Sequence, residues 1–448
     1  MLDLIHRYHD LLTPEIAEET HAHIEAALTR RGLVFGGRAL CTVLRPRLTT
    51  PREVASLQGR IRPLMRAMKR AYARAMADRA FRDQFGLLDW EETLLADAPG
   101  YDWPSPTSRL DFFYVPSTGR LGLTEYNAET PAGAAYNDAL CQAFLDAPAV
   151  REFARSFEVM TLPSLPGVVG AILAAWHEFS RSRRRPRIAI LDWDDVPTRT
   201  EFELYRAHFA TLGIEAVIDD PRRCEYRDGT LWVAGAPADL IYKRVLISEL
   251  IETCGMGHDV VRAVREGAVC LVDGFRCKIL HKKASLAVLS DEANADTFTP
   301  DELEAIHDCI PWTRVVRERH TTHRGDTIDL VPWMVAHKDQ LVLKPNDEYG
   351  GKGITLGWTV SASEWEGAIR EALAHPFIVQ EKVAIPSEPY ASWADGRVHV
   401  LERMLDTAPF ITHGDYMEGM LTRLSTAALL NVTAGGGSTV PTLVVQPR

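Results

Sequence analysis

The stretch LVLKPNDEYGGKGITLGW spans residues 341–358 and carries the clearest structural signal in the chain. Its apolar start predicts a strand that delivers Lys344. A turn then leads into a glycine-rich tetrapeptide made of Gly350, Gly351, Lys352 and Gly353. Glycine backbone can approach a polyphosphate closely and aim N–H groups at it, and a lysine on a strand adds a fixed positive charge. The spacing fits neither a Walker A loop nor a Rossmann fingerprint. The segment is therefore a candidate phosphate clamp, with a plain hairpin around a glycine turn as the alternative.

A second apolar strand is expected downstream, over residues 377–383 (FIVQEKV). It breaks into polar residues at Gln380, Glu381 and Lys382. The backbone at such a strand end can offer a donor and an acceptor to an adenine edge, and a nearby carboxylate can bind a ribose hydroxyl. Its place after the glycine-rich segment favours a nucleotide hinge, and an ordinary strand end is the alternative.

Two strands, over residues 110–116 and 122–126, are predicted with a turn at residues 117–120 between them. Residues two apart on a strand share a face, so Arg109 projects with Asp111, and Glu125 projects with Asn127. Pairing of the two strands would gather Asp111, Glu125 and Asn127 into a cluster of oxygen ligands, which suits Mg²⁺. Arg109 beside this cluster is placed to contact a transferring phosphoryl group. The alternative is a solvated hairpin face with an Arg–Asp pair.

Together these segments resemble the circularly permuted ATP-grasp enzymes, in particular the synthetase domain of glutathionylspermidine synthase and, more distantly, eukaryotic-type glutathione synthetase. In that pattern an Arg-x-Asp strand precedes a Glu-x-Asn strand, and a Lys-Pro and Gly-Gly segment follows late in the chain. The resemblance covers residues 105–448. It implies that Mg²⁺ is held by Asp111, Glu125 and Asn127. It also implies nucleotide binding by Lys344, Gly350, Gly351, Lys352, Gly353, Gln380, Glu381 and Lys382.

Two further segments are similar to parts of the same family. A phosphate-binding lysine is expected ahead of the glycine-rich segment, and residues 277–287 (CKILHKKASLA) resemble the stretch that carries it. Lys283 is the favoured nucleotide ligand, and Lys278 and Lys282 are the other candidates for this role. The alternative is a cluster of lysines on one face of a helix. Arg423, followed by residues 431–437 (NVTAGGG), resembles the arginine-led lid loop of these ligases, with a flexible tail as the alternative.

The resemblance implies an ATP-dependent carboxylate–amine ligase that works through an acyl phosphate and releases ADP and phosphate. Arg109, Lys344 and Arg423 are then catalytic, and ATP and Mg²⁺ are the cofactors. The expected partners are a small-molecule or peptide carboxylate, an amine and a second copy of the chain in a homodimer. No amidase-type domain precedes the ligase region, so a bifunctional enzyme is not implied. A catalytically silent ATP-binding scaffold and a small-molecule kinase are the alternatives.

Changes in the helix and strand patterns along the sequence predict four regions. The expected fold class is mixed α+β and α/β, with a circularly permuted ATP-grasp fold. The regions are a helical N-terminal region at 1–105, metal-binding strands and a helix of the ATP-grasp core at 106–166, a parallel α/β substrate domain at 167–275, and a nucleotide-binding region with a glycine-rich loop at 276–448.

The parallel layer is predicted from a strand, helix and strand pattern at residues 188–219. Residues 231–233 and 240–242 are expected to continue it, and a helix is expected over 134–157. Asp194 and Arg244 lie at predicted strand ends, where ligand crevices occur in parallel sheets. A substrate contact is one interpretation of both, and a plain strand-end loop is the alternative.

The chain has 448 residues with 46 % hydrophobic and 25 % charged, the composition of an ordinary globular protein. Its formal net charge of −11 argues against coating nucleic acid or an anionic membrane. The arginines within residues 181–187 are interpreted as an exposed linker between a helix and a strand. No apolar stretch reaches the roughly 20 residues that span a bilayer, and no signal peptide is evident, so a cytoplasmic location is expected. The seven scattered cysteines are expected to be reduced thiols, mostly buried.

Overall fold

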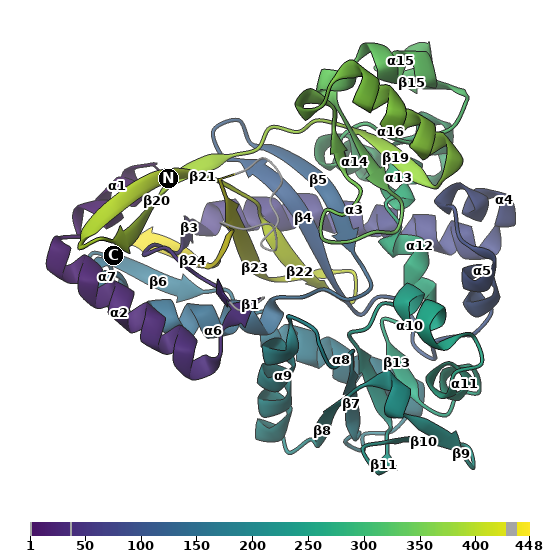
Figure 1. The fold of residues 1–448 in the computed structure, drawn as a ribbon, viewed down its shortest axis with the longest axis horizontal. Coiled ribbons are helices and arrows are strands. Elements are labelled where there is room, and N and C mark those ends of the chain that lie inside the picture. Colours follow the sequence, from purple (N-terminus) through teal and green to yellow (C-terminus); the bar gives the residue numbers. More distant parts are fainter. Residues whose placement is uncertain (1, 36–37, 427–436) are drawn as a thin grey trace.

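The computed structural model describes residues 2–35, 38–426 and 437–448. Within them the chain is a mixed α/β structure with three main sheets (Figure 1). A nine-stranded sheet lies in the middle, a four-stranded parallel sheet lies on one side of it, and a four-stranded antiparallel sheet lies on another. The mixed fold class is therefore confirmed.

The nine-stranded sheet combines strands from the two ends of the chain. Its order is β20-β21-β23-β22-β4-β5, and β24 pairs with β23, β3 and β6. The pairs are antiparallel except for β24 with β3. Because β3 belongs to this sheet, the predicted helical region at 1–105 also supplies a strand to the centre of the molecule. The strands are β3 (Arg47–Thr49), β4 (Thr107–Val115), β5 (Arg120–Asn127), β6 (Phe157–Thr161), β20 (Ser387–Ala394), β21 (Arg397–Leu405), β22 (Ala408–Thr412), β23 (Tyr416–Ser425) and β24 (Ser438–Pro447).

Helices pack on this sheet through two hydrophobic clusters. In the first cluster, α1, α2, α6 and α7 contact strands that include β20 and β24. In the second, α3 and α14 pack on β4 and β5. The expected helix at 134–157 is wrong in extent, because Pro148 starts a new helix and residues 157–161 form β6. The helices are α1 (Leu2–Asp10), α2 (Pro14–Arg31), α3 (Pro51–Ala77), α6 (Ala134–Leu145), α7 (Pro148–Phe153) and α14 (Pro300–Cys309).

The parallel sheet has the order β13-β12-β7-β8, and all its pairs are parallel. This confirms the strand, helix and strand unit at 188–219 and its continuation at 240–242. The expectation for residues 231–233 is wrong, because β10 pairs antiparallel with β9 and β11 in a separate small sheet. The β9–β10 turn contains Asp228 and Gly229, both with positive φ, which is typical of a tight hairpin. The elements are α8 (Leu165–Ser180), β7 (Ile188–Leu191), α9 (Arg199–Thr211), β8 (Ala216–Asp219), β9 (Glu225–Arg227), β10 (Thr230–Val233), β11 (Ala236–Pro237), β12 (Leu240–Lys243), α10 (Ile247–Cys254), α11 (Asp259–Arg265) and β13 (Cys270–Val272).

The antiparallel four-stranded sheet has the order β14-β19-β17-β18. Helix α15 packs on this sheet through Leu330 and Met334, and α16 packs in the same cluster through Trp365 and Ile369. Helix α13 packs through Ala284 and Ala287 against Ile378. The elements are α12 (Lys278–His281), α13 (Ala284–Ser290), β14 (Thr313–Val315), α15 (Leu330–Ala336), β17 (Leu341–Pro345), β18 (Thr355–Leu356), α16 (Ala362–Ala374) and β19 (Phe377–Glu381). The remaining α-helices and strands of the described residues are β1 (Val34–Phe35), β2 (Arg38–Ala39), α4 (Arg79–Arg82), α5 (Asp89–Leu95), β15 (His320–His323) and β16 (Asp326–Asp329).

The cysteines are free thiols, and all but Cys254 are buried, as the sequence predicts. Among the described residues, none of the helices has the length and apolar character that a membrane crossing requires.

Candidate functional site

A cavity of about 160 Å³ lies between the nine-stranded sheet and the antiparallel four-stranded sheet. The first sheet contributes Asp111 of β4, Glu125 of β5 and Arg423 of β23. The second contributes Lys344 of β17 and Gln380 of β19. The other lining residues are Phe113, Thr124, Lys283, Val342, Gly350, Gly351, Ile354, Leu356, Trp358, Glu381, Val383, Ile385 and Asp406. Residues predicted from segments far apart in the sequence thus meet around one space.

The predicted pairing of the two metal strands is confirmed. In the β4–β5 ladder Asp111 lies opposite Glu125, and Arg109 lies opposite Asn127. Arg109 does not line the cavity; it donates from Nε and Nη2 to the two carboxylate oxygens of Asp111 at 2.7 and 3.0 Å. Arg423 Nη2 donates to the same carboxylate at 2.7 Å. Burial raises the pKa of Asp111, but the two guanidiniums lower it by more, so the pKa falls well below its usual range.

Arg423 also binds Asp406, a residue that the sequence motifs do not mark. Its Nε donates to Asp406 Oδ2 at 2.5 Å, and its backbone N–H donates to Oδ1 at 2.6 Å. Asp406 lies in the short connection between β21 and β22, where no pattern distinguishes it from other buried acids. The predicted lid loop that follows Arg423, apart from Gly437, lies outside the described residues.

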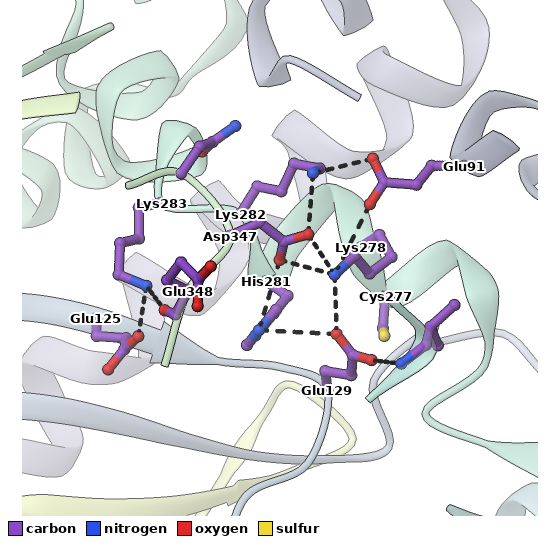
Figure 2. A network of polar contacts seen from close by, with 12 residues as sticks. Glu91, Glu125, Glu129, Cys277, Lys278, His281, Lys282, Lys283, Asp347 and Glu348 are labelled. Atoms are coloured by element: carbon purple, nitrogen blue, oxygen red, sulfur yellow. Dashed lines mark hydrogen bonds and ion pairs between the residues drawn. The ribbon is translucent and has the colours of Figure 1, made fainter. Parts of the chain in front are cut away.

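Glu125 is paired with Lys283, whose Nζ lies 2.8 Å from Glu125 Oε1 (Figure 2). The ammonium also donates to the Glu348 carbonyl at 2.5 Å. Burial raises the pKa of Glu125, and Lys283 lowers it by more, so the net pKa is lowered. Asn127 is half-buried and does not line the cavity, and within the described part of the chain its Nδ2 has no hydrogen-bond partner.

These groups fit a hard divalent cation. Asp111 and Glu125 are both held ionised, and carboxylate oxygens are the ligands that Mg²⁺ prefers. The side-chain nitrogen of Asn127 has no hydrogen-bond partner among the described residues, so the amide can rotate and present its oxygen to a cation. In this structure arginine and lysine side chains balance the two carboxylates, so metal binding would exchange ion pairs rather than fill an uncompensated acidic site.

Lys344 projects into the cavity from the opposite sheet. Its Nζ donates to the Thr124 carbonyl at 2.9 Å and to Gln380 Oε1 at 2.8 Å. Burial lowers the pKa of Lys344 to about 8, with Glu125 acting against that shift. Gln380 is fixed in turn because its Nε2 donates to Thr313 Oγ1 at 3.0 Å.

The glycine-rich segment joins β17 to β18. Gly350, Gly351 and Gly353 have φ values of 64°, 80° and 70°, a region that L side chains rarely adopt. Gly350 and Gly351 line the cavity, whereas Gly353 and Lys352 do not. The Lys352 side chain is 76 % exposed and pairs with Glu348 at 3.3 Å, so the structure places it away from the predicted phosphate contact.

The hinge residues behave differently from one another. Glu381 lines the cavity, with Oε1 2.8 Å from His323 Nε2. Lys382 does not line it; its ammonium lies 4.1 Å from the ring centroid of Trp358, which does. The sequence motifs do not mark the apolar wall of the cavity, which Ile354, Leu356 and Trp358 form at β18 and the 3-10 turn that follows it.

The structure separates the three candidate lysines (Figure 2). Lys283 lines the cavity, whereas Lys278 and Lys282 form ion pairs behind it with Asp347. The sequence preference for Lys283 over its neighbours therefore agrees with the geometry.

Charged residues singled out elsewhere lie outside the cavity lining. Residues 181–187 connect α8 to β7, which confirms the interpretation of this segment as a linker. Within it, Arg184 pairs with Asp239 and Arg187 pairs with Glu215. Asp194 pairs with Arg223 at 2.6 Å. Arg244 is buried, and its Nη1 donates to the Pro131 carbonyl at 2.8 Å.

No family model matches the chain. A curated relative named "Putative glutamate--cysteine ligase 2-3", from Frankia alni, is 24 % identical over an alignment of 469 positions, gaps included, that covers 95 % of this chain and 50 % of that protein. The chain thus spans half the length of this relative. A glutathione synthetase-like effector from Globodera pallida superposes with a TM-score of 0.60 at 12 % identity, covering 96 % of this chain and 98 % of the other. D-alanyl-alanine synthetase A from Vibrio cholerae gives a TM-score of 0.26 at 10 % identity, covering 59 % and 90 %.

The overlap with the effector extends over nearly the whole of both chains. Specific kinship with glutathionylspermidine synthase and circular permutation of the chain remain predictions. The chain has a mixed α/β fold similar to that of this glutathione synthetase-like effector.

Proposed function

We propose that the protein is an ATP-dependent ligase that joins a carboxylate to an amine. The observation that carries the proposal is the cavity itself. Lys283, Lys344 and the glycine-rich segment face Asp111, Glu125 and Arg423 across a space between two sheets. Cations, glycine backbone and ionised carboxylates in one cavity match the demands of a bound metal–triphosphate.

The nucleotide would lie with its base between the apolar walls and its phosphates near the lysines. Trp358 and Leu356 offer a flat apolar surface, and Glu381 lies beside them for a ribose hydroxyl. Lys283 and Lys344 would neutralise phosphate charge. Asp111, Glu125 and Asn127 would hold Mg²⁺, which supplies Lewis-acid charge neutralisation on the phosphates when bound.

In the proposed reaction a substrate carboxylate oxygen attacks the γ-phosphorus of ATP, and ADP leaves. The amine nitrogen then attacks the acyl carbon, a proton is lost from nitrogen, and phosphate leaves as the amide forms. Arg423 reaches the cavity and would stabilise charge on the acyl phosphate, while Arg109 holds Asp111 in place from behind. Catalysis is then mainly positioning and charge stabilisation.

The name of the curated relative supports an amino acid or short peptide as the acid and amine source. Kinship with glutathionylspermidine synthase and a homodimer are further parts of the proposal that follow only from the motif resemblance. A cytoplasmic location is a further part that follows from the sequence pattern alone.

The test is substitution of Glu125 by alanine. We expect Glu125→Ala to lower Mg²⁺-dependent ADP release by about a hundredfold or more, because a carboxylate that would hold the charge-neutralising Mg²⁺ is lost. The measurement is ADP formation with a library of amino acids and amines, together with far-UV circular dichroism. Glu402→Ala, at an exposed position on β21, is the control for a surface carboxylate. An unchanged rate in Glu125→Ala rejects the metal assignment.

The same assay separates the alternatives. A ligase needs both acid and amine for repeated turnover, a kinase yields a phosphorylated compound without an amine, and a scaffold binds ATP with no turnover on any pair.

A further inference from the structure

Behind the cavity, five charged side chains form a contiguous group, here called the carboxylate–lysine network (Figure 2). Asp347 has 19 % of its side chain exposed, and the other four members are buried. They come from α5, the segment just after β5, α12 and its C-cap, and the turn after β17. The members are Glu91, Glu129, Lys278, Lys282 and Asp347.

Lys278 is the central member of this network. Its Nζ lies 3.2 Å from Glu129 Oε2 and 2.7 Å from the carboxylate of Asp347. Lys282 pairs with Asp347 at 3.1 Å and with Glu91 at 2.9 Å. Charges buried in this way are tolerated only when they are paired, and loss of one partner leaves the other uncompensated.

The chain itself supplies a cation between Glu129 and Asp347, namely the ammonium of Lys278. Glu129, His281 and Asp347 each offer an atom within 4.8 Å of the others, an arrangement that resembles a metal site. The Lys278 ammonium already bridges two of the three groups. Burial lowers the pKa of His281 to about 4, so the histidine is neutral at physiological pH and the lysine supplies the positive charge.

Each end of the bridge is close in sequence to the candidate site. Glu129 comes two residues after Asn127, and Asp347 comes three residues before Gly350. Glu129 Oε1 also accepts a hydrogen bond of 2.5 Å from the backbone N–H of Ile247, at the start of α10. The bridge therefore joins three bodies: the metal strand β5, the glycine-rich segment and the parallel-sheet region.

We infer that Lys278 is a positioning residue for the nucleotide phosphates. By bridging Glu129 and Asp347 it holds the glycine-rich segment at a fixed distance from the carboxylates of β4 and β5. This inference rests on the proposed function, because the held geometry matters only when a triphosphate lies between those two parts.

The test compares binding of Mg²⁺-ATP and of AMP by isothermal titration calorimetry. Lys278→Met keeps the length of the side chain and removes its charge. We expect it to weaken ATP binding by about tenfold or more, since small misplacements of a binding group are costly. AMP affinity should stay unchanged, because AMP lacks the phosphates that the glycine-rich segment would contact. Lys278→Arg should restore ATP affinity in part.

The matched control is Lys243→Met. Lys243 is equally buried and lies 3.4 Å from Glu129, but it makes no ion pair with Asp347. It should lower the melting temperature without changing ATP affinity more than about twofold, because the bridge is intact. If Lys278→Met does not fold, Asp347→Asn replaces it, with the same expected loss of ATP affinity.

Three results would overturn the inference: unchanged ATP affinity in the bridge variant that folds, equal loss of ATP and AMP affinity in it, or equal loss of ATP affinity in Lys243→Met. Failure of the wild-type protein to bind ATP would instead reject the proposed function on which the inference rests.

Discussion

Lys344 differs in its bonding from the other cations at the cavity. Arg423 and Lys283 each form an ion pair with a carboxylate, whereas the Lys344 ammonium donates to two neutral oxygens, the Thr124 carbonyl and the Gln380 amide. Desolvation therefore dominates, and the pKa of Lys344 falls to about 8. Its charge is present at pH 7 and largely absent at pH 9.

This pKa predicts how ATP binding depends on pH. Phosphates favour the charged lysine, so the contribution of Lys344 to affinity is constant below pH 8 and declines by up to about tenfold per pH unit above it. The measurement is the Kd for Mg²⁺-ATP at pH 7 and pH 9. Lys344→Arg keeps its charge over this range and should lose the decline; an identical pH profile in both proteins would contradict the assignment.

Lys344 also affects the stability of the protein without ATP, and here a rise in pH has the opposite effect: it increases stability instead of weakening binding. An unfolded lysine has a pKa of about 10.4, so between pH 8 and pH 10 the unfolded chain binds more protons than the folded chain. The Lys344 contribution to the free energy of unfolding therefore rises with pH in that window, relative to Lys344→Met.

At the scale of an element, β18 and the turn after it form one wall of the cavity. Gly357 follows β18 directly, between Leu356 and Trp358, which both line the cavity. A Cβ at Gly357 would lie 1.8 Å from the Lys338 carbonyl oxygen, a backbone atom that cannot rotate away. This close approach of two backbone segments explains why glycine is needed here.

Gly357→Ala is expected to lower the free energy of unfolding by about 1–3 kcal/mol or more, because the two segments must move apart. Urea unfolding followed by circular dichroism measures the change. Gly59 provides the matched control, since it lies exposed in α3 and a Cβ added there would have no atom within 4 Å. Gly59→Ala should raise stability by about 0.5–1 kcal/mol. Equal stability of the wild type and Gly357→Ala would contradict this, because it would mean that the segments around Gly357 and Lys338 can move apart at no cost in free energy.

The elements that the sequence predicted well are those with a local pattern. Alternation and a short turn were enough to pair Asp111 with Glu125 across β4 and β5. The same holds for the strand that carries Lys344. Asp406 could not be found in this way, because its importance comes only from the approach of Arg423 on another strand. The hairpin β9–β10 was missed because its turn residues, rather than its apolar run, decide its partner.

At the scale of the whole molecule, β24 connects segments that no local pattern relates. It pairs with β23 from late in the chain and with β3 and β6 from early in it. Leu443 lies at this junction, buried, opposite Leu48 on one side and Thr161 on the other. The N-terminal helices and the central sheet thus share one core.

Leu443→Ala is expected to cost about 2–5 kcal/mol, because it leaves a cavity at the junction of three strands. The helices and the sheet should lose stability together, so thermal unfolding followed by far-UV circular dichroism and by tryptophan fluorescence should shift by the same amount. Val400→Ala, at an exposed apolar position on β21, should change stability by no more than about 0.5 kcal/mol. Separate shifts for the two probes would mean that the regions unfold independently.

The pairing of β24 also determines when the central sheet can be completed during protein synthesis. Thr442 pairs with Arg47, so the partner of an early strand is made 395 residues later. At about 5–20 residues per second the ribosome needs about 20–80 s to cover that gap. During this time β3 has no strand partner, and β6 lacks its partner for the later part of it; such unpaired edges are prone to bind other chains. The central sheet is therefore completed only after almost all of these residues have been synthesised.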